Sequence, residues 1–519
     1  MQVGVNTICA FAFAGIALVF SASVNADSLT VKTDQGKVVG KTINDAKVKA
    51  FLGLPYAAPP VGEMRWKAPG PPAKWKSTRD ATHYGAHCIQ GRVFADMIFQ
   101  DAGPSEDCLF LNVYAPSAAK ATSKLPVMFW IHGGGYVGGA ASEPRHNGDF
   151  LPAKGVVLVT INYRLGVLGF LATADLAKEA GGVTGNYGLL DMVAALQWVK
   201  ANIAKFGGDP DNVTIFGESA GSFAVSTLMA APPARGLFQK AIGESGGAFS
   251  DVLPTNTLET SEKKNGEWVA SLGAKTLAEL RAMPADAVLE AAGKDGAPRF
   301  APVIDGRFLT EPVPQTFAQG MQAHVPLLAG WNRDENAGMA NDMTVEKWKA
   351  FATEHFGDRA EEFLTLYPGE SDEQAARSAT DYGSDAFIAF GTWKWIEAHR
   401  RTGSSPVYCY HFEQPAPPSK FHPDAIAFHS DDIEYVFGTI DTRPGAVWSP
   451  EERKLSDEMM SYWTNFAKTG DPNGEGLPEW PKYGTERQLI HLDTTITSGP
   501  STVEPRYDFL LKGMPPLQR

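Results

Sequence analysis

The sequence predicts an α/β fold in which a large, twisted and mostly parallel β-sheet is flanked by helices. Short apolar runs end abruptly in polar or glycine-rich turns, a pattern typical of strands that are buried on both faces. Helical stretches separate several of these runs. Strands that alternate with helices form a parallel sheet covered on both sides, and catalytic groups gather at the carboxyl ends of its strands.

The expected strands and helices follow one another along most of the chain. No internal repeat or long linker interrupts them, so we expect one catalytic unit that carries helical insertions around the entrance to its site. Apolar runs predict strands at 125–131, 155–161, 212–216, 240–242, 326–330 and 407–411. Helical patterns are clearest at 189–206, 220–230, 344–363 and 386–401, and residues 255–325 also read as helices joined by loops.

The N-terminal residues predict an export signal. Residues 8–20 form an apolar run of 13 residues, which is too short to span a bilayer comfortably. Val24-Asn-Ala26 matches a small-residue cleavage site, although no Lys or Arg precedes the run. We therefore expect residues 1–26 to be a removed signal peptide and residues 27–519 to be a single domain that is secreted or periplasmic. The alternative is a buried N-terminal helix.

Composition limits the partners of this chain. The 519 residues are 44% hydrophobic and carry a net charge of −13, which is the composition of an acidic globular protein. No basic cluster stands out, so we expect no nucleic-acid partner. No further stretch is long and apolar enough to span a membrane. No Cys/His cluster repeats a metal-ligand spacing, so neither a metal nor a cofactor is predicted.

A Gly-x-Ser-x-Gly pattern occurs twice, and its setting distinguishes the two serines. Ser219 follows the expected strand 212–216 and precedes the expected helix 220–230. A sharp strand-to-helix turn exposes a serine hydroxyl and places the next N–H, that of Ala220, at a helix N-terminus that can bind an anion. Ser245 follows a strand-like run, but no helix is expected after it. Ser219 is therefore the favoured nucleophile.

Glycines near this serine leave space that side chains would fill. Bulky residues at Gly217 and Gly221 would collide with the packed helix and strand. Residues 132–136 read His-Gly-Gly-Gly-Tyr at the end of another expected strand, where bare N–H groups can approach a substrate.

Gly133-x-Gly135-x-x-Gly138 also fits a dinucleotide fingerprint. That alternative is disfavoured because the next strand ends in Asn162-Tyr-Arg164, without Asp or Glu, and no clear helix follows the glycines.

Motifs along nearly all of the chain after residue 26 resemble the type-B carboxylesterases, the branch of the α/β-hydrolase superfamily that also includes the cholinesterases. Each motif is modest evidence, but their order is highly specific. The resemblance implies an α/β-hydrolase fold and a serine esterase. The motifs are FLGLPYAAPPVGEMRW (51–66), SEDCLFLN (105–112), HGGGY (132–136), NYR (162–164), GNYG (185–188), FGESAGS (216–222), YWTNFAKTGDPN (462–473) and WPKY (480–483).

The resemblance also implies the partners of Ser219. Its family places an acid between the serine and the histidine, in a motif like Lys-Asp-Glu-Gly, and Arg333-Asp-Glu-Asn336 matches it. Glu335 is therefore implied as the acid, while Asp334 is nearly as good from the residues alone, since both follow the same expected strand. His429 fits the family's histidine motif, whereas the rival His422 lacks that context.

Further residues take roles from the same resemblance. The N–H groups of Gly134, Gly135 and Ala220 are implied to form the oxyanion hole. Glu218 and Asp432 resemble the family's acids near the histidine; the alternative for each is a plain solvated side chain.

The cysteines predict one disulfide. Cys88 and Cys108 lie in a polar, turn-rich segment of a chain that we expect to be exported, which favours a disulfide, and the resemblance implies the same pair. Cys409 falls in an expected strand and is predicted to be a buried free thiol. The resemblance also implies a structural ion pair between Arg65 and Glu106.

The segment between these cysteines argues against a choline ester as substrate. Cholinesterases carry a tryptophan there that binds the choline cation. Residues 89–107 contain no tryptophan and offer only Phe94, Met97 and Phe99, so cation–π binding is weakened.

These residues together predict an exported serine hydrolase that cleaves small-molecule carboxylic esters through an acyl-enzyme intermediate. An amidase or a thioesterase would use the same machinery and is the first alternative. A non-catalytic binding or adhesion protein on the same fold is the second, but the intact Ser219, Glu335 and His429 argue against it. No oligomeric state is predicted.

Overall fold

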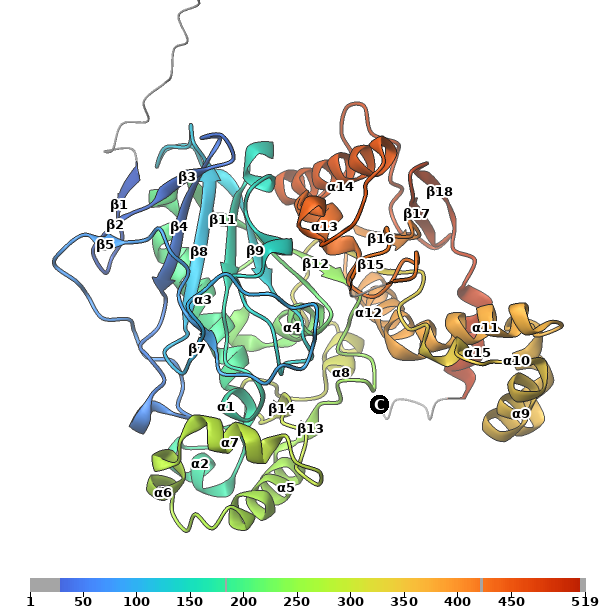
Figure 1. Cartoon of the computed structure of the whole chain (residues 1–519), viewed down its shortest axis with the longest axis horizontal. Helices are drawn as coiled ribbons and strands as arrows, with labels where there is room; N and C mark the ends of the chain where they lie inside the picture. Colours follow the sequence, from blue (N-terminus) through green and yellow to red (C-terminus); the bar gives the residue numbers. More distant parts are fainter. Residues whose placement is uncertain (1–28, 183, 421–422, 514–519) are drawn as a thin grey trace, which may run out of the picture.

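A twisted, eleven-stranded β-sheet forms the centre of the computed structural model (Figure 1). The structure describes residues 29–182, 184–420 and 423–513, so the expected signal peptide lies outside the described residues. In spatial order the strands are β18 (Thr497–Pro500), β17 (Gln488–Leu492), β16 (Val407–Phe412), β15 (Leu327–Asn332), β12 (Lys240–Glu244), β11 (Gly208–Glu218), β9 (Leu125–Ile131), β10 (Val157–Ile161), β8 (Phe110–Pro116), β4 (Val48–Pro55) and β3 (Lys41–Ile43).

The sheet is parallel through its centre and antiparallel at both edges. Every neighbouring pair from β17 to β10 is parallel. The pairs β17–β18, β10–β8, β8–β4 and β4–β3 are antiparallel. Each strand expected from an apolar run is present in this sheet. The predicted α/β fold with a mostly parallel sheet is therefore confirmed.

Helices cover both faces of this sheet and extend beyond it (Figure 1). Helices α5 to α7 lie together at the bottom of that view, and α9 and α10 lie at its right edge. The helices are α1 (Gly166–Phe170), α2 (Ala174–Glu179), α3 (Tyr187–Asn202), α4 (Ala220–Ala230), α5 (Leu258–Ser271), α6 (Leu277–Ala282), α7 (Ala285–Ala292), α8 (Val313–Ala318), α9 (Val345–Phe356), α10 (Ala360–Leu366), α11 (Asp372–Ser384), α12 (Phe390–Thr402), α13 (Asp432–Phe437), α14 (Pro450–Thr469) and α15 (Glu504–Lys512).

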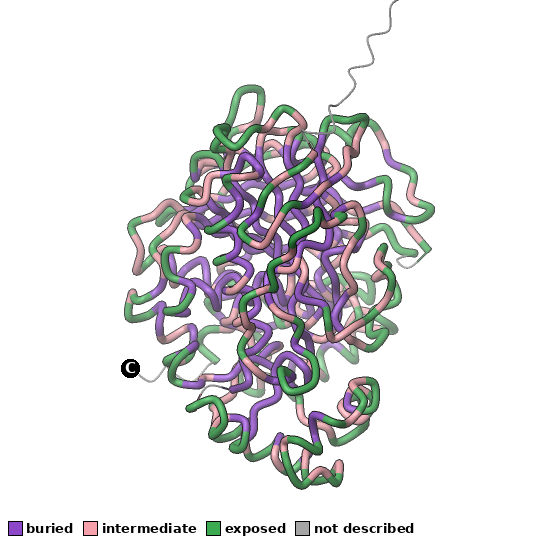
Figure 2. Tube along the Cα trace, turned by 90° about the vertical axis from the view of Figure 1, so that its left-hand side faces the viewer, coloured by how far each residue is buried: buried purple, intermediate pink, exposed green. Residues whose placement is uncertain are grey.

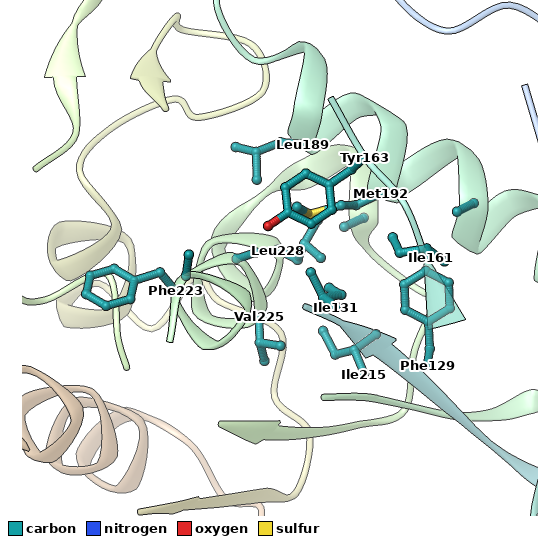
Figure 3. Close-up of a cluster of buried hydrophobic side chains, with 14 of the residues drawn as sticks. Phe129, Ile131, Ile161, Tyr163, Leu189, Met192, Ile215, Phe223, Val225 and Leu228 are labelled. Carbon is teal, nitrogen blue, oxygen red and sulfur yellow. The ribbon is translucent and has the colours of Figure 1, made fainter. Parts of the chain in front are cut away.

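Successive side chains of the central strands belong alternately to two hydrophobic cores. In β9, Val127, Phe129 and Ile131 belong to one core and Met128 and Trp130 to the other, because successive side chains of a strand point to opposite faces. The first core packs against α3, α4 and α12, and Figure 3 shows where side chains of α3 and α4 meet the sheet. The second packs against α13 and α14. Buried residues accordingly run through the middle of the molecule (Figure 2).

Two helical predictions are corrected by the structure. Residues 344–363 are not one helix, because α9 ends at Phe356, just before Gly357, whose φ of 52° favours glycine, and α10 starts at Ala360. The helix expected at 386–401 starts earlier, since α11 runs into a π-helical turn at Asp385–Ala389 and then into α12.

The carboxyl ends of β9, β11 and β15, and the segment after β16, carry the residues predicted to be functional. The glycine-rich residues 132–136 follow β9, Ser219 follows β11, and Glu335 follows β15. His429 lies on the segment between β16 and α13. Among the helices within the described ranges, none is long and apolar enough to cross a membrane.

Candidate active site

Ser219 makes the sharp turn between β11 and α4. The strand ends at Glu218 and the helix begins at Ala220, so a single residue forms the turn. Its φ of 53° and ψ of −123° are a conformation that non-glycine residues rarely adopt. The first N–H groups of α4 have no acceptor within the helix. The strand–turn–helix setting predicted for Ser219 is confirmed.

The two glycines that flank Ser219 are required by close backbone packing. A Cβ atom on Gly217 would lie 2.5 Å from the carbonyl oxygen of Ile131, and one on Gly221 would lie 2.0 Å from the same oxygen. Both distances are far inside van der Waals contact. A side chain at either position would therefore push α4 and β9 apart.

His429 lies between Ser219 and Glu335. Its Nε2 is 3.0 Å from Oγ of Ser219, and its Nδ1 is 2.5 Å from Oε2 of Glu335. Glu335 is buried, and its other carboxylate oxygen accepts a hydrogen bond of 2.7 Å from the backbone N–H of Asn332. The fixed carboxylate can accept from Nδ1–H, which leaves Nε2 free to accept the serine proton.

Asp334, the alternative acid, makes different contacts. Its carboxylate pairs with Arg333 at 2.9 Å and with Arg377 at 2.6 Å, and it accepts from the N–H of Ala427 at 3.1 Å. These bonds tie the end of β15 to the segment that leads to the histidine. The structure thus brings Glu335, and not Asp334, against His429. The rival histidine at 422 lies outside the described residues.

Three backbone N–H groups near Ser219 have no acceptor in the described part of the chain. They belong to Gly134, Gly135 and Ala220. The glycine-rich loop lies directly over the serine, because a Cβ atom on Gly133 would be only 3.1 Å from Cβ of Ser219. Gly134 and Gly135 have φ of 94° and 64°, which favour glycine. Free N–H groups held in this way can bind a developing oxyanion.

Negative charge surrounds the imidazole of His429. Oε1 of Glu218 lies 3.3 Å from its Nε2. Burial opposes the charged imidazolium, but the carboxylates of Glu218 and Glu335 outweigh it and raise the pKa of His429 to about 9. Burial also raises the pKa of Glu218 to about 8, against the opposing charge of His429. When the carboxylate of Glu218 is charged, it therefore favours the protonated form of the neighbouring imidazole.

Asp432 lies in the same buried region and is held by two donors. The hydroxyl of Tyr410 donates to it at 2.8 Å and the amide of Asn332 at 3.2 Å. Burial raises the pKa of Asp432 to about 6. The amide of Asn332 also donates to the carbonyl of Phe428, next to His429, at 2.7 Å. Asn332 therefore connects the acid loop to the histidine loop, although sequence analysis did not single it out.

Glu244 is a second residue that sequence analysis missed. Its carbonyl accepts the N–H of Ser219 at 2.9 Å, and its carboxyl group accepts from the indole of Trp463 at 2.7 Å. Burial raises the pKa of Glu244 well above its usual range, and the charges of Asp432 and Glu218 add to this effect. Its only signal in the sequence was its place in the second Gly-x-Ser-x-Gly copy.

Two other residues contact His429 or its neighbour Ser430. Phe387, on the π-helical turn before α12, packs edge-on against the imidazole with ring centroids 5.1 Å apart. Arg145 donates to the hydroxyl of Ser430 at 3.1 Å and pairs with the buried carboxylate of Glu143 at 2.6 Å. Neither residue lies in a sequence pattern that would have marked it.

The structure forms the predicted disulfide between Cys88 and Cys108. Its loop reaches the glycine-rich segment, because a Cβ atom on Gly134 would meet the methyl group of Met97 at 3.1 Å. Phe94 approaches Gly138 in the same way, whereas Phe99 packs on the ring of His87 instead.

The remaining structural predictions from the sequence also hold. Cys409 is a buried free thiol in β16. Arg65 and Glu106 form a bidentate ion pair with two contacts of 2.6 Å.

The competing interpretations of the glycine and serine motifs are not supported. No α-helix follows Gly138 before Gly166 within the described residues, as a dinucleotide site would require. Ser245 also has a positive φ, of 50°, but no helix starts directly after it, since the next described helix, α5, begins at Leu258. Its Oγ is buried and has no hydrogen-bond partner among the described residues, so no histidine there can activate it.

Comparisons with known proteins identify relatives over most of the chain. The profile of the carboxylesterase family matches residues 27–510. The chain is 38% identical over 491 residues to the para-nitrobenzyl esterase of Bacillus subtilis (strain 168), covering 90% of this chain and 95% of that protein. It is 35% identical over 513 residues to the fumonisin B1 esterase of Sphingopyxis macrogoltabida, covering 93% and 92%. Among solved structures, the carboxylesterase EST55 of Geobacillus stearothermophilus matches with a TM-score of 0.80 at 32% identity, covering 93% of this chain and 99% of that one.

Proposed function

The chain belongs to the carboxylesterase family and is a serine hydrolase of carboxylic esters, and from this premise we propose that Ser219, His429 and Glu335 are its catalytic residues. One observation carries the proposal. Two hydrogen bonds in series join the serine hydroxyl to the imidazole and the imidazole to a buried carboxylate. These groups come from three segments far apart in the chain and meet at one edge of the sheet.

In the proposed mechanism, Oγ of Ser219 attacks the carbonyl carbon of the ester while Nε2 of His429 takes the hydroxyl proton. Glu335 orients the imidazole and stabilises its positive charge. The negative oxygen of the tetrahedral intermediate binds the three free N–H groups of the glycine-rich loop and Ala220. His429 then gives its proton to the departing alcohol. Water, deprotonated by the same imidazole, attacks the acyl group on Ser219 and frees the acid.

Glu218 and Asp432 set the charge around this histidine in the proposed mechanism. The carboxylate of Glu218, 3.3 Å from Nε2, stabilises the imidazolium that forms when His429 takes the proton of Ser219. Asp432 acts at longer range and holds the acid loop through Asn332.

Replacement of Ser219 by alanine tests the assignment, with Ser245→Ala as the matched control. We expect Ser219→Ala to lower kcat for a p-nitrophenyl or p-nitrobenzyl ester by about 10⁶-fold, because no other described hydroxyl contacts His429. Ser245→Ala should keep most of the activity. Circular dichroism and thermal unfolding would show that both variants fold. Full activity of Ser219→Ala, or equal loss in both variants, would reject the assignment.

The same proposal includes export of the enzyme after removal of residues 1–26. The apolar run at 8–20, the small residues before Asp27 and a disulfide between Cys88 and Cys108 support it, since disulfides persist in oxidising compartments. Expression of the full chain in a host with an export pathway, followed by intact-mass analysis, tests it. A mature chain that starts at Asp27 outside the cytoplasm is expected, and an uncleaved cytoplasmic chain would contradict it.

A further inference from the structure

Two histidines and a glutamate that are not part of the triad meet at the end of two neighbouring strands. His411 is near the end of β16, and parallel pairing places it directly opposite His491 of β17. Glu413 follows β16 on the same side, two residues after His411. Nδ1 of His411 is 2.7 Å from Oε1 of Glu413, and Nδ1 of His491 is 2.6 Å from the same oxygen.

The strand geometry explains why these three side chains share one face. Side chains alternate along a strand, so residues 411 and 413 point the same way, as Cys409 does. His491 follows the same alternation from Leu489, which packs in the same core as Cys409. The backbone N–H of Glu413 donates to the carbonyl of Leu492 at 2.9 Å, which fixes the glutamate beside β17.

One side of the cluster packs against a buried side chain, and the other side is partly exposed to solvent. The ring of His411 packs on the indole of buried Trp331, with centroids 5.9 Å apart. The three side chains are 17%, 27% and 22% exposed for residues 411, 413 and 491 respectively. A small ion and its water ligands can therefore reach the donor atoms from solvent.

The charge of this cluster suits a cation. Within the described residues, the only ion-pair partners of Glu413 are these two imidazoles, which carry positive charge only when protonated. The site therefore offers one carboxylate and two ring nitrogens, and no lysine or arginine of the described residues pairs with that carboxylate.

We propose that His411, Glu413 and His491 bind a divalent transition-metal ion of the zinc class. Their donor atoms lie within 4.8 Å of one another, as the ligands of one ion must. Two imidazole nitrogens and one carboxylate oxygen are a donor set that zinc uses with a fourth position filled by water. The ion takes the place of the Nδ1 protons, which the neutral rings then carry on Nε2. The sequence does not show this site as a metal-binding motif, because His491 lies 78 residues after Glu413.

Metal titration of the whole, tag-free enzyme tests the proposal. After removal of metals by chelation, isothermal titration with Zn²⁺ at pH 7.5 should show one site per chain, and Co²⁺ should give the visible absorption of a low-coordinate complex. Zn²⁺ should also raise the unfolding midpoint, because it binds the folded chain. His491→Asn and Glu413→Gln should each weaken binding by at least about 100-fold, given that even the loss of outer partners costs 10- to 100-fold.

The controls separate this site from the ester hydrolase. His355→Asn, which changes an exposed histidine on α9, should bind Zn²⁺ as the wild type does. Ser219→Ala should also bind it. In the unmutated protein, Zn²⁺ should protect His411 and His491, and not His355, from diethyl pyrocarbonate. Absence of stoichiometric binding, equal binding by His491→Asn, or no selective protection would overturn the proposal.

Discussion

Glu335 and Asp334 are adjacent acids at the end of the same strand, yet they have different contacts. Glu335 accepts a hydrogen bond from the N–H of Asn332 and contacts His429. Asp334 instead pairs with two arginines and accepts a hydrogen bond from the N–H of Ala427. Both follow an expected strand in the sequence, so residue type alone could not separate them. The twist of the chain after β15 decides which one reaches the imidazole.

A pair of neutral substitutions distinguishes these two acids. Glu335→Gln should lower kcat by about 10⁴-fold, because the amide keeps the shape of the carboxylate but neither holds the Nδ1–H tautomer nor stabilises the imidazolium. Asp334→Asn should lower the unfolding midpoint but leave kcat within about tenfold of the wild type, since its carboxylate does not touch His429. Steady-state kinetics with titrated active sites measure both. Reversed effects would make Asp334 the catalytic acid.

The charge on Glu218 predicts a shift in the pH profile. A carboxylate 3.3 Å from Nε2 favours the protonated imidazole, and the base must be neutral to act. Glu218→Gln removes this effect, so the pKa of His429 should fall. The acidic limb of kcat/KM should therefore move to lower pH by about 1 unit. An unchanged limb, or one that moves to higher pH, would show that Glu218 does not control the protonation of His429.

The strand–turn–helix element around Ser219 depends on close packing between α4 and β9. The sequence predicts this element from an apolar run, the Gly-x-Ser-x-Gly pattern and a helix of small residues, and the structure confirms it. The π-helical turn that brings Phe387 to His429 was not predicted. A π-helical turn holds one more residue than an α-helical turn. A single sequence does not mark this extra residue, because apolar residues continue on both sides of the turn.

Two glycine-to-alanine substitutions test this packing, because one should lower the free energy of unfolding and the other should raise it. Gly221→Ala should lower the free energy of unfolding by about 1–3 kcal/mol, because its Cβ overlaps the carbonyl of Ile131. It should also lower kcat/KM by about 100-fold as the N–H of Ala220 shifts. Gly266→Ala lies in α5 with no atom near its Cβ, so it should stabilise the protein by about 0.5–1 kcal/mol. Denaturant unfolding and ester kinetics check both; a stable, fully active Gly221→Ala would contradict the packing argument.

At the scale of the whole molecule, the sheet order brings together segments that the chain keeps far apart. Strands β9, β11, β12 and β15 are neighbours, and their carboxyl ends carry the glycine-rich loop, Ser219, Glu244 and Glu335. Apolar runs and motif order predict the α/β fold, the triad and the disulfide. They do not predict Asn332 or Glu244, because the roles of these residues come from contacts between loops.

The same limit applies to the cluster of His411, Glu413 and His491. No spacing along the chain marks it, since only the parallel pairing of β16 with β17 places the two histidines opposite each other. Long-range pairing is what a single sequence specifies least directly. A site whose residues come from different strands can therefore be recognised only in the folded structure.

In the proposed mechanism, His429 activates the hydroxyl of Ser219 and no other. A fluorophosphonate probe reacts covalently with such a hydroxyl, and peptide mass spectrometry then locates the adduct. We expect one label per chain on the peptide that contains Ser219, loss of that label in Ser219→Ala, and full labelling in Ser245→Ala. A label on Ser245, or a folded wild-type enzyme that takes no label, would contradict the account.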